Sequence, residues 1–190
     1  MKLPRLIVLV VALLAAQPLA AAPRTYRLDP AESVVGFVWS FGKDRVQGRM
    51  PVADARVQVD FEKLANSTVS VSVDATRAEA GFLFATQAMR GPRMLDADRH
   101  GRITFTSRSV RSEGRGALIE GDLTVRGITR PVAMHASLHR QSGTAQGDLD
   151  HLQILLTGTL RRSDFGATGW SDMVADEVEL RILAAIDAAP

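Results

Sequence analysis

Apolar and polar residues alternate along most of the chain that follows its apolar N-terminal stretch. The alternation is clearest from Val57 to Phe61 and from Val69 to Val73, where every second side chain is apolar. A period of two is the pattern of a strand that buries one face and exposes the other. Similar patterns predict further strands over residues 25–28, 34–40, 46–49, 103–107, 118–125, 132–138, 152–160 and 178–184. About eight to ten short strands separated by turn residues are typical of an antiparallel β-sandwich or β-barrel.

The stretch from Gly121 to Val132 predicts a strand, a tight turn and a second strand. Apolar and polar residues alternate before the turn. Gly127 supplies the backbone freedom that a sharp bend needs. Pro131 has no amide hydrogen to donate, so we expect it at the start of the next strand, which we place at Val132.

The segment from Ala78 to Leu95 has no alternation. It is rich in apolar residues, and the Gly91-Pro92 pair ends any helix that forms there. We expect a short helix with ragged ends, followed by a loop. Its apolar side chains either plug one end of a barrel or take part in ordinary core packing, and the sequence supports both interpretations equally.

The faces that the alternation directs inward carry no charged side chain. A barrel of about eight strands has an interior that side chains can just fill or that can hold one ligand. An uncharged lining suits an alkyl or isoprenoid chain and rejects sugars, nucleotides and metal ions, although the same residues would also fill a solid core. Apolar residues from the Ala78–Leu95 segment and from the C-terminal third of the chain join these inward residues as candidates. The candidate ligand-binding residues are Phe37, Trp39, Phe61, Phe82, Phe84, Met89, Met94, Phe105, Leu123, Val125, Met134, Phe165 and Trp170.

The first residues have the order of a secretory signal peptide. Lys2 and Arg5 precede an uncharged apolar run, and small residues follow it. The run is about half of the roughly 20 residues that span a bilayer, so a membrane anchor is disfavoured. We expect cleavage after Ala21, which makes residues 1–21 a signal peptide and residues 22–190 a single domain that is periplasmic or secreted.

Removal of the signal peptide changes what the charge implies. The full chain has 23 basic and 21 acidic residues, and both basic residues in excess lie in residues 1–21. The balanced remainder does not indicate a nucleic-acid partner. The chain has no cysteine, which excludes disulfides, thiolate metal sites and cysteine nucleophiles. About 170 residues fit one domain with a substantial core, and we expect no stable membrane insertion.

The sequence offers no catalytic or metal-binding motif, so we expect no catalytic residue, no metal site and no cofactor. His135 and His139 would share one face of a helix, but on a strand they lie about 13 Å apart, too far to bind one metal ion. Neither a Gly-x-Ser-x-Gly elbow nor a glycine-rich phosphate loop occurs.

Four blocks, in the right order, resemble the YceI-like family of secreted lipocalin-like proteins. Gly121–Val132 resembles its Gly-x-Leu-Thr-x-x-Gly-x-Thr-x-Pro-Val signature, and the other blocks are Tyr26–Phe37, Ile103–Ser107 and Arg162–Gly166. The resemblance implies an all-β fold, an antiparallel lipocalin-like barrel of about eight strands with a short helix or loop as a plug. It also implies that the protein binds an isoprenoid lipid. In the last block, we expect Asp164 to accept hydrogen bonds from backbone amides of its turn.

Two positions depart from the family, since Glu32 and Ser40 stand where many members have histidine. Any contact of those histidines with a ligand head group or with the rim is altered here. The leading hypothesis is a non-enzymatic protein that sequesters or carries a quinone or polyprenyl chain. The alternatives are a redox or enzymatic accessory that uses the same cavity, and a stress-response or surface-interaction protein without lipid cargo. A homodimer formed through an exposed sheet edge is compatible with the sequence.

Overall fold

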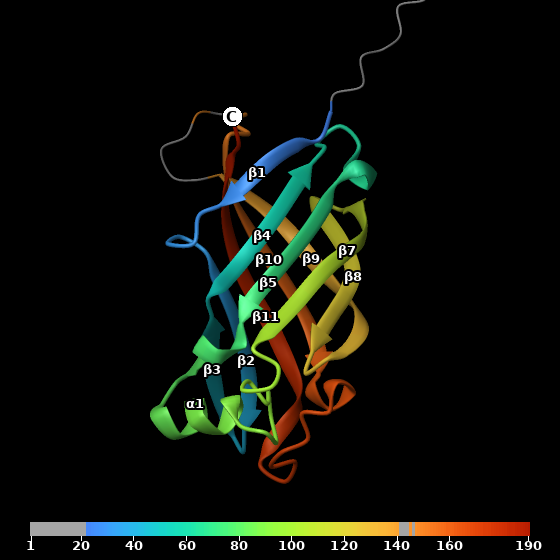
Figure 1. Cartoon of the computed structure of the whole chain (residues 1–190). Helices are drawn as coiled ribbons and strands as arrows, with labels where there is room; N and C mark the ends of the chain where they lie inside the picture. The colour runs from blue at the N-terminus through green and yellow to red at the C-terminus, as the bar shows by residue number, and fades with distance from the viewer. Residues whose placement is uncertain (1–21, 141–144, 146) are drawn as a thin grey trace, which may run out of the picture.

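The protein is built mainly from β-strands (Figure 1). The computed structural model describes residues 22–140, 145 and 147–190, so the expected signal peptide lies outside the described residues. The strands are β1 (Arg24–Leu28), β2 (Val34–Phe41), β3 (Asp44–Met50), β4 (Val52–Val59), β5 (Thr68–Asp74), β6 (Glu79–Ala80), β7 (Arg102–Glu113), β8 (Gly116–Val125), β9 (Ile128–Arg140), β10 (His151–Arg161) and β11 (Val174–Ala188). The helical elements are α1 (Leu83–Arg90) and the 3-10 turns η1 (Leu64–Asn66), η2 (Ala75–Arg77) and η3 (Arg162–Phe165).

Eight of these strands close into an antiparallel barrel, as predicted. The ring runs β1, β4, β5, β7, β8, β9, β10 and β11, and β11 pairs back onto β1. The closing contact pairs Tyr26 with Ala188 and Leu28 with Ile186. Closure removes the free edges that an open sheet would present. The prediction of an all-β antiparallel barrel with one short helix is therefore confirmed.

The β2–β3 hairpin lengthens the barrel wall at one end. β2 continues along β11 beyond β1, because Val34 pairs with Leu183 after Leu28 has paired with Ile186. β3 pairs with β2 and, on its other edge, with β6. α1 follows β6 in the chain, so the hairpin and the helix flank the same end of the barrel (Figure 1).

Helix α1 confirms the short helix predicted between Ala78 and Leu95. It ends at the Gly91-Pro92 pair, where the Gly91 amide donates to the carbonyls of Gln87 and Ala88. Across the described parts of the chain, no helix is long and apolar enough to cross a membrane.

Two aromatic side chains pack over glycines of neighbouring strands. Phe37 lies opposite Gly48 of β3, and a Cβ atom at Gly48 would lie only 2.4 Å from the Phe37 ring. A Cβ atom at Gly121 would likewise lie 2.6 Å from the ring of Phe105. Both rings are buried. Each glycine therefore gives an inward aromatic side chain the space to pack against the backbone of the barrel wall.

Replacing Gly48 with alanine is expected to lower the free energy of unfolding by about 1 to 3 kcal/mol, because the new methyl group overlaps the Phe37 ring and the Glu79 carbonyl. Chemical denaturation measures this difference. Gly81→Ala is the matched control, since a Cβ atom there has no contact closer than 3.8 Å. Equal stability of the two variants would show that Phe37 moves aside without cost.

The turn between β8 and β9 is a two-residue hairpin. Arg126 and Gly127 both have positive φ angles, 54° and 74°, as a type I′ turn requires. β9 begins at Ile128, so the prediction that this strand starts at Val132 is wrong. At Pro131, β9 pairs with β8 on one edge, whereas its pairing with β10 on the other edge covers only residues 135–140. Pro131 is tolerated inside the strand because one edge of β9 is unpaired at this position.

The strand predicted to end at Phe61 ends earlier. β4 stops at Val59, and the Asp60 carboxylate accepts hydrogen bonds from the amides of Glu62 and Lys63 and from the Asn66 side chain. This turn places Phe61 beyond the strand, where its ring meets the Tyr26 ring edge-on at a centroid distance of 6.3 Å.

Candidate functional site: an apolar cavity inside the barrel

Inward side chains of the barrel surround an apolar cavity of about 370 Å³. This volume lies within the range of about 300–1,000 Å³ that is typical of small-molecule sites. The residues around it include twelve of the thirteen candidates from the sequence: Phe37, Trp39, Phe82, Phe84, Met89, Met94, Phe105, Leu123, Val125, Met134, Phe165 and Trp170. Phe61 is not among them, because it packs against Tyr26. Contact of these residues with a ligand stays a prediction.

Strand alternation explains why distant segments meet at this cavity. On β2, the side chains of Phe37 and Trp39 point inward two residues apart, and their rings stack with centroids 5.6 Å apart and planes inclined by 19°. Other strands contribute aliphatic side chains that the sequence prediction did not include, among them Val69, Val71, Val73, Ile154, Leu156, Val178, Leu180 and Ile182. These residues also follow a period of two, so the same signal was available for them.

Two residues of the lining carry a hydroxyl or a charged group, Ser33 and Arg162. The Ser33 hydroxyl already bonds to the backbone of Ala185, whose amide donates to it at 3.0 Å. The Arg162 guanidinium also donates to backbone carbonyls. Because both groups have backbone partners, the wall of the cavity presents apolar surface to a ligand.

Arg162 was missed as a residue of the cavity wall, since a charged side chain is ordinarily expected at the surface. It is only 6% exposed. Its guanidinium donates to the carbonyls of Ala167, Gly169, Val174 and Ala175. Desolvation lowers the pKa of Arg162, and the nearby Asp176 carboxylate acts in the opposite direction. One side chain thus holds the connection between β10 and β11 against the end of the barrel.

Asp176, rather than the predicted Asp164, accepts the hydrogen bonds of the neighbouring turn. The Ser163 amide donates to Asp176 Oδ1 at 2.9 Å, and the Ser163 hydroxyl donates to Oδ2 at 2.7 Å. Partial burial disfavours the charged form of this carboxylate, but the two hydrogen bonds and the nearby arginines outweigh burial and lower its pKa. The expectation for Asp164 was wrong because the partner comes from β11, not from the turn itself.

Helix α1 closes part of the same end of the barrel. Met89 is buried in a cluster with Phe37, Met50, Val73 and Ala78, and it also borders the cavity. The helix therefore takes part in core packing and in the cavity wall, so the two interpretations of this segment both apply.

Arginine side chains fix the loops beside the helix. Arg126 donates to the carbonyls of Pro92 and Met94. The Arg93 guanidinium lies 5.0 Å from the centre of the Trp170 ring, a distance suited to a cation–π contact. These contacts tie the loop that follows α1 to the β8–β9 hairpin and to the loop that precedes β11.

Glu32 and Ser40 do not line the cavity. Glu32 is exposed in the turn between β1 and β2, and Ser40 lies on β2 next to the inward Trp39. Alternation along β2 directs Ser40 to the opposite face of the wall. The change from histidine at these two positions therefore alters the outside or the rim of the barrel rather than the cavity lining.

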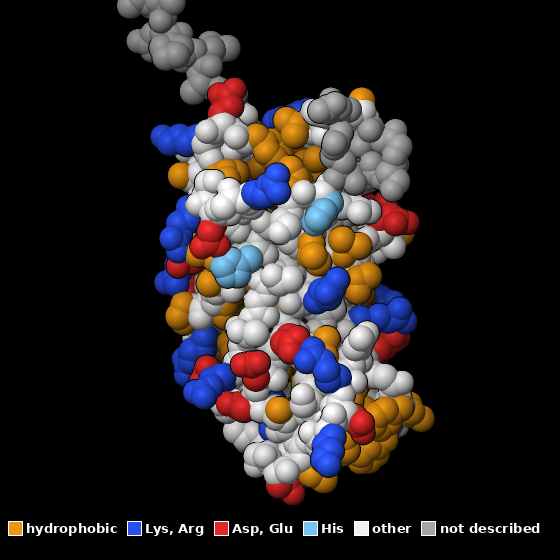
Figure 2. All heavy atoms as spheres, turned by 180° about the vertical axis from the view of Figure 1, so that it is seen from behind, with side chains coloured by type: hydrophobic (Ala, Val, Ile, Leu, Met, Phe, Trp, Pro, Cys, Tyr) orange, Lys and Arg blue, Asp and Glu red, His pale blue; other side chains and the backbone are white. Residues whose placement is uncertain are grey.

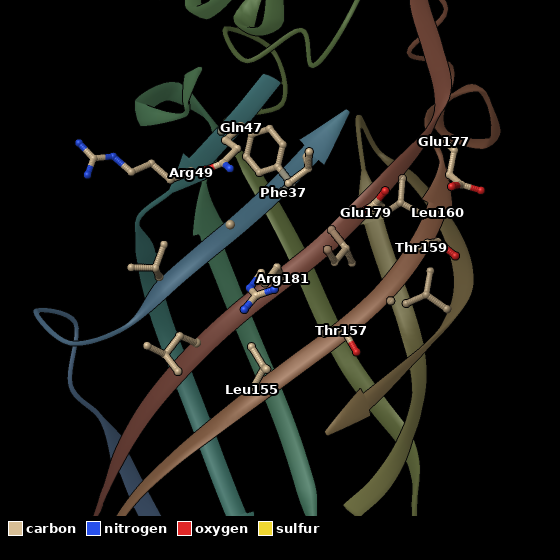
Figure 3. A pocket seen from close by; sticks show the side chains of 18 of the residues that line it. Phe37, Gln47, Arg49, Leu155, Thr157, Thr159, Leu160, Glu177, Glu179 and Arg181 are labelled. Atoms are coloured by element: carbon tan, nitrogen blue, oxygen red, sulfur yellow. The ribbon is translucent and has the colours of Figure 1, made fainter. Parts of the chain in front are cut away.

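A broad groove of about 1760 Å³ lies on the outer face of the barrel. Figure 3 shows Arg181, Glu179, Thr157 and Leu155 along β10 and β11 in this groove. Much of its charge is internally paired, since Arg45 contacts Glu179 at 2.6 Å and Arg49 contacts Glu79 at 2.7 Å. These pairs are exposed, and the groove contrasts with the apolar interior on the other side of the same strands.

Histidines on the barrel surface pair with carboxylates. His135 Nδ1 lies 2.6 Å from Glu113 Oε2, and His151 Nδ1 lies 2.8 Å from Asp187 Oδ1. The hydrogen bond to Asp187 raises the pKa of His151. Among the residues whose positions the structure describes, no group of three or more His, Cys, Asp or Glu side chains is arranged to hold a metal ion.

The model of the YceI-like domain matches residues 26–186, which include the whole barrel from β1 almost to the end of β11. The chain belongs to the YceI-like domain family. Proteins of this family are generally non-catalytic and bind isoprenoids. The family assignment made from the four sequence blocks is thereby confirmed.

Curated relatives of this YceI-like protein are bacterial. A UPF0312 protein of Vibrio parahaemolyticus is 30% identical over 125 residues, which cover 64% of this chain and 66% of the relative. A UPF0312 protein of Pectobacterium carotovorum is 26% identical over 148 residues, which cover 78% of this chain and 73% of the relative. The match thus spans slightly less than two thirds of the Vibrio protein's length.

Solved structures share the YceI-like fold at low sequence identity. BcnA of Burkholderia cenocepacia superposes with a TM-score of 0.73 at 21% identity, over 84% of this chain and 99% of that protein. A YceI protein of Campylobacter jejuni gives a TM-score of 0.60 at 17% identity, over 75% of this chain and 85% of that protein. These similarities support the fold.

Proposed function

We propose that this protein binds an isoprenoid lipid, a quinone or a polyprenyl chain, inside the barrel and sequesters or carries it without making or breaking a bond. The observation that carries the proposal is the cavity lining, in which aliphatic and aromatic side chains predominate. The hydroxyl of Ser33 and the guanidinium of Arg162 already form hydrogen bonds with backbone groups. Such a lining selects a ligand by its apolar surface. The general property of the family supports the same conclusion.

Burial of the chain supplies the free energy of binding. Each methylene-sized group that leaves water contributes about 0.8 kcal/mol, before the cost of ordering the ligand. A few isoprene units therefore suffice for micromolar affinity, which corresponds to about 8 kcal/mol. The Met89 and Met94 side chains border the cavity, and their flexible thioethers can adapt to a branched chain.

The same lining sets the orientation of the bound lipid. A quinone ring or a phosphate head group needs hydrogen-bond partners or water, and the apolar wall offers no such partners. We infer that the apolar chain occupies the cavity while the polar end lies at the barrel end beside α1. The signal-like N-terminal sequence supports a periplasmic or secreted location for this activity.

Native mass spectrometry of protein purified from its secreting host tests the proposal. We expect a one-to-one adduct whose organic extract contains an isoprenoid lipid, because the cavity is shaped for one apolar chain. Protein stripped of lipid should regain an adduct when a short-chain quinone is added. A homogeneous ligand-free mass, together with failure to take up quinones and polyprenols, would refute the carrier function and favour a role for the outer groove.

A further inference from the structure

A ridge of large apolar side chains projects from the barrel end that carries α1. Its members Phe82, Leu83 and Phe84 are 52%, 73% and 68% exposed; we call these three residues the mouth ridge. From Gly81 to Met89 the chain has no charged residue. Figure 1 shows the helix standing out from the barrel, and Figure 2 shows hydrophobic side chains gathered at this end. An exposed apolar cluster of this kind marks an interaction surface.

The mouth ridge is continuous with the cavity. Four residues border the cavity and are also exposed at the surface: Phe82, Phe84, Phe41 and Met173. Backbone hydrogen bonds hold the contributing segments together: the Gly42 amide donates to the Met173 carbonyl at 2.8 Å, and the Gly81 amide donates to the Gln47 carbonyl at 3.1 Å. Apolar surface therefore extends without interruption from the interior of the barrel to the outside.

We propose that the mouth ridge inserts into the surface of a lipid bilayer, so that the barrel end beside α1 faces the membrane. This inference rests on the proposed function, because it supplies the route by which an apolar chain enters and leaves. A lipid that moves along the ridge exchanges one apolar environment for another and does not cross water. Aromatic and leucine side chains at the end of a helix are suited to the interfacial region of a bilayer.

The charges around the ridge favour an anionic lipid surface. The connection between β5 and β7 carries four arginines and three acidic residues: Arg77, Arg90, Arg93 and Arg99 against Glu79, Asp96 and Asp98. Two of the acidic groups have cationic neighbours, since Glu79 contacts Arg49 and Asp96 contacts Arg99. Exposed Lys43 adds a positive charge at the tip of the β2–β3 hairpin, where Asp44 and Asp172 contribute negative charge. With Arg49 counted, six basic groups stand against five acidic ones, a small excess that favours anionic head groups.

A bilayer explains the position of the ridge better than a second copy of the chain does. A partner subunit that covered these side chains would also cover the cavity mouth, whereas a membrane would leave the mouth in contact with lipid. The helix that carries the ridge also projects from the barrel (Figure 1), which fits insertion between lipids.

Vesicle flotation with the ligand-free protein tests the proposal, using vesicles of equal parts phosphatidylcholine and phosphatidylglycerol. Leu83→Glu is the decisive variant, because Leu83 is the most exposed member of the ridge and does not border the cavity. We expect it to reduce the vesicle-bound fraction at least about tenfold. Leu138→Glu is the matched control, because Leu138 is also exposed, at 44%, but lies on β9 and borders neither the ridge nor the cavity. Vesicle binding by this variant should equal that of the wild type.

Two further measurements separate this inference from the proposed function. Uptake of a short-chain quinone in the absence of vesicles should be the same for Leu83→Glu and the wild type, so loss of docking with retained uptake supports the membrane role. Wild-type protein that takes up quinone but does not float, or Leu83→Glu protein that floats normally, would overturn the docking proposal alone. A wild-type dimer that Leu83→Glu converts to a monomer, without vesicle binding by either, would show that the ridge contacts a second copy instead.

Discussion

Replacing Trp39 with aspartate is expected to weaken binding of an isoprenoid quinone at least about 100-fold, which corresponds to about 2.7 kcal/mol. Trp39 borders the cavity and stacks on Phe37, so the change removes apolar contact area and places a carboxyl group against the ligand. A carboxylate in an apolar cavity either retains water, which competes with the lipid, or takes up a proton at a cost in free energy. Titration with a short-chain quinone, followed by native mass spectrometry, measures the loss.

Ser40→Asp provides the matched control for this experiment. It introduces the same group one residue later on β2, on the opposite face of the strand and away from the cavity lining. Binding by this variant should stay within about twofold of the wild type. Circular dichroism and thermal unfolding establish that both variants are folded. Normal quinone uptake by a folded Trp39→Asp variant would exclude the cavity as the binding site.

Local pattern was enough to predict part of the cavity wall. Residues such as Phe105, Leu123 and Met134 lie on strands with a period of two, and any closed barrel brings their inward faces together. Phe61 follows the same pattern but fails, because the Asp60 side chain forms a turn with the backbone after β4. Side-chain hydrogen bonding in a turn competes with strand extension, and a residue pattern alone does not show which one prevails.

Barrel closure, in contrast, depends on contacts between the two ends of the chain. Tyr26 of β1 pairs with Ala188 of β11, and such a pairing has no local signature because sandwiches show the same alternation. Here the resemblance of four sequence blocks to the YceI-like family indicated the barrel, and the pairing of β1 with β11 confirms it. The continuity between the cavity and the mouth ridge also emerges only from the fold, since it joins the β2–β3 hairpin, α1 and the loop before β11.

Arg162 shows why a cavity residue can escape prediction. Sequence reasoning treats an arginine as exposed, but the carbonyls of Ala167, Gly169, Val174 and Ala175 are brought around this side chain by the turn that follows η3. A buried guanidinium without these acceptors would be strongly unfavourable. The sequence does mark Arg162, because it is the first residue of the Arg162–Gly166 block that resembles the family. The structure gives a physical reason for an arginine at this position, since its side chain holds the loop between η3 and β11.

Replacing Arg162 with methionine is therefore expected to lower the free energy of unfolding by about 3 to 5 kcal/mol, because several carbonyls lose their donors in a buried setting. For a domain of this size the change corresponds to a fall in Tm of about 10 °C. Thermal unfolding measures the effect. Arg161→Met is the matched control, since Arg161 is exposed and lies 3.9 Å from Asp176, so its loss should change stability by less than about 0.5 kcal/mol.

The comparison of these two arginine variants also tests what the loop does for the cavity. Phe165, Trp170 and Val174 border the cavity and belong to the segment that Arg162 holds. If the side chain fixes this wall, folded Arg162→Met protein below its Tm should bind quinone more weakly and release it faster than Arg161→Met. Equal stability and equal release rates would mean that water replaces the guanidinium at the four carbonyls without loss, and that the end of the barrel is held by its apolar contacts alone.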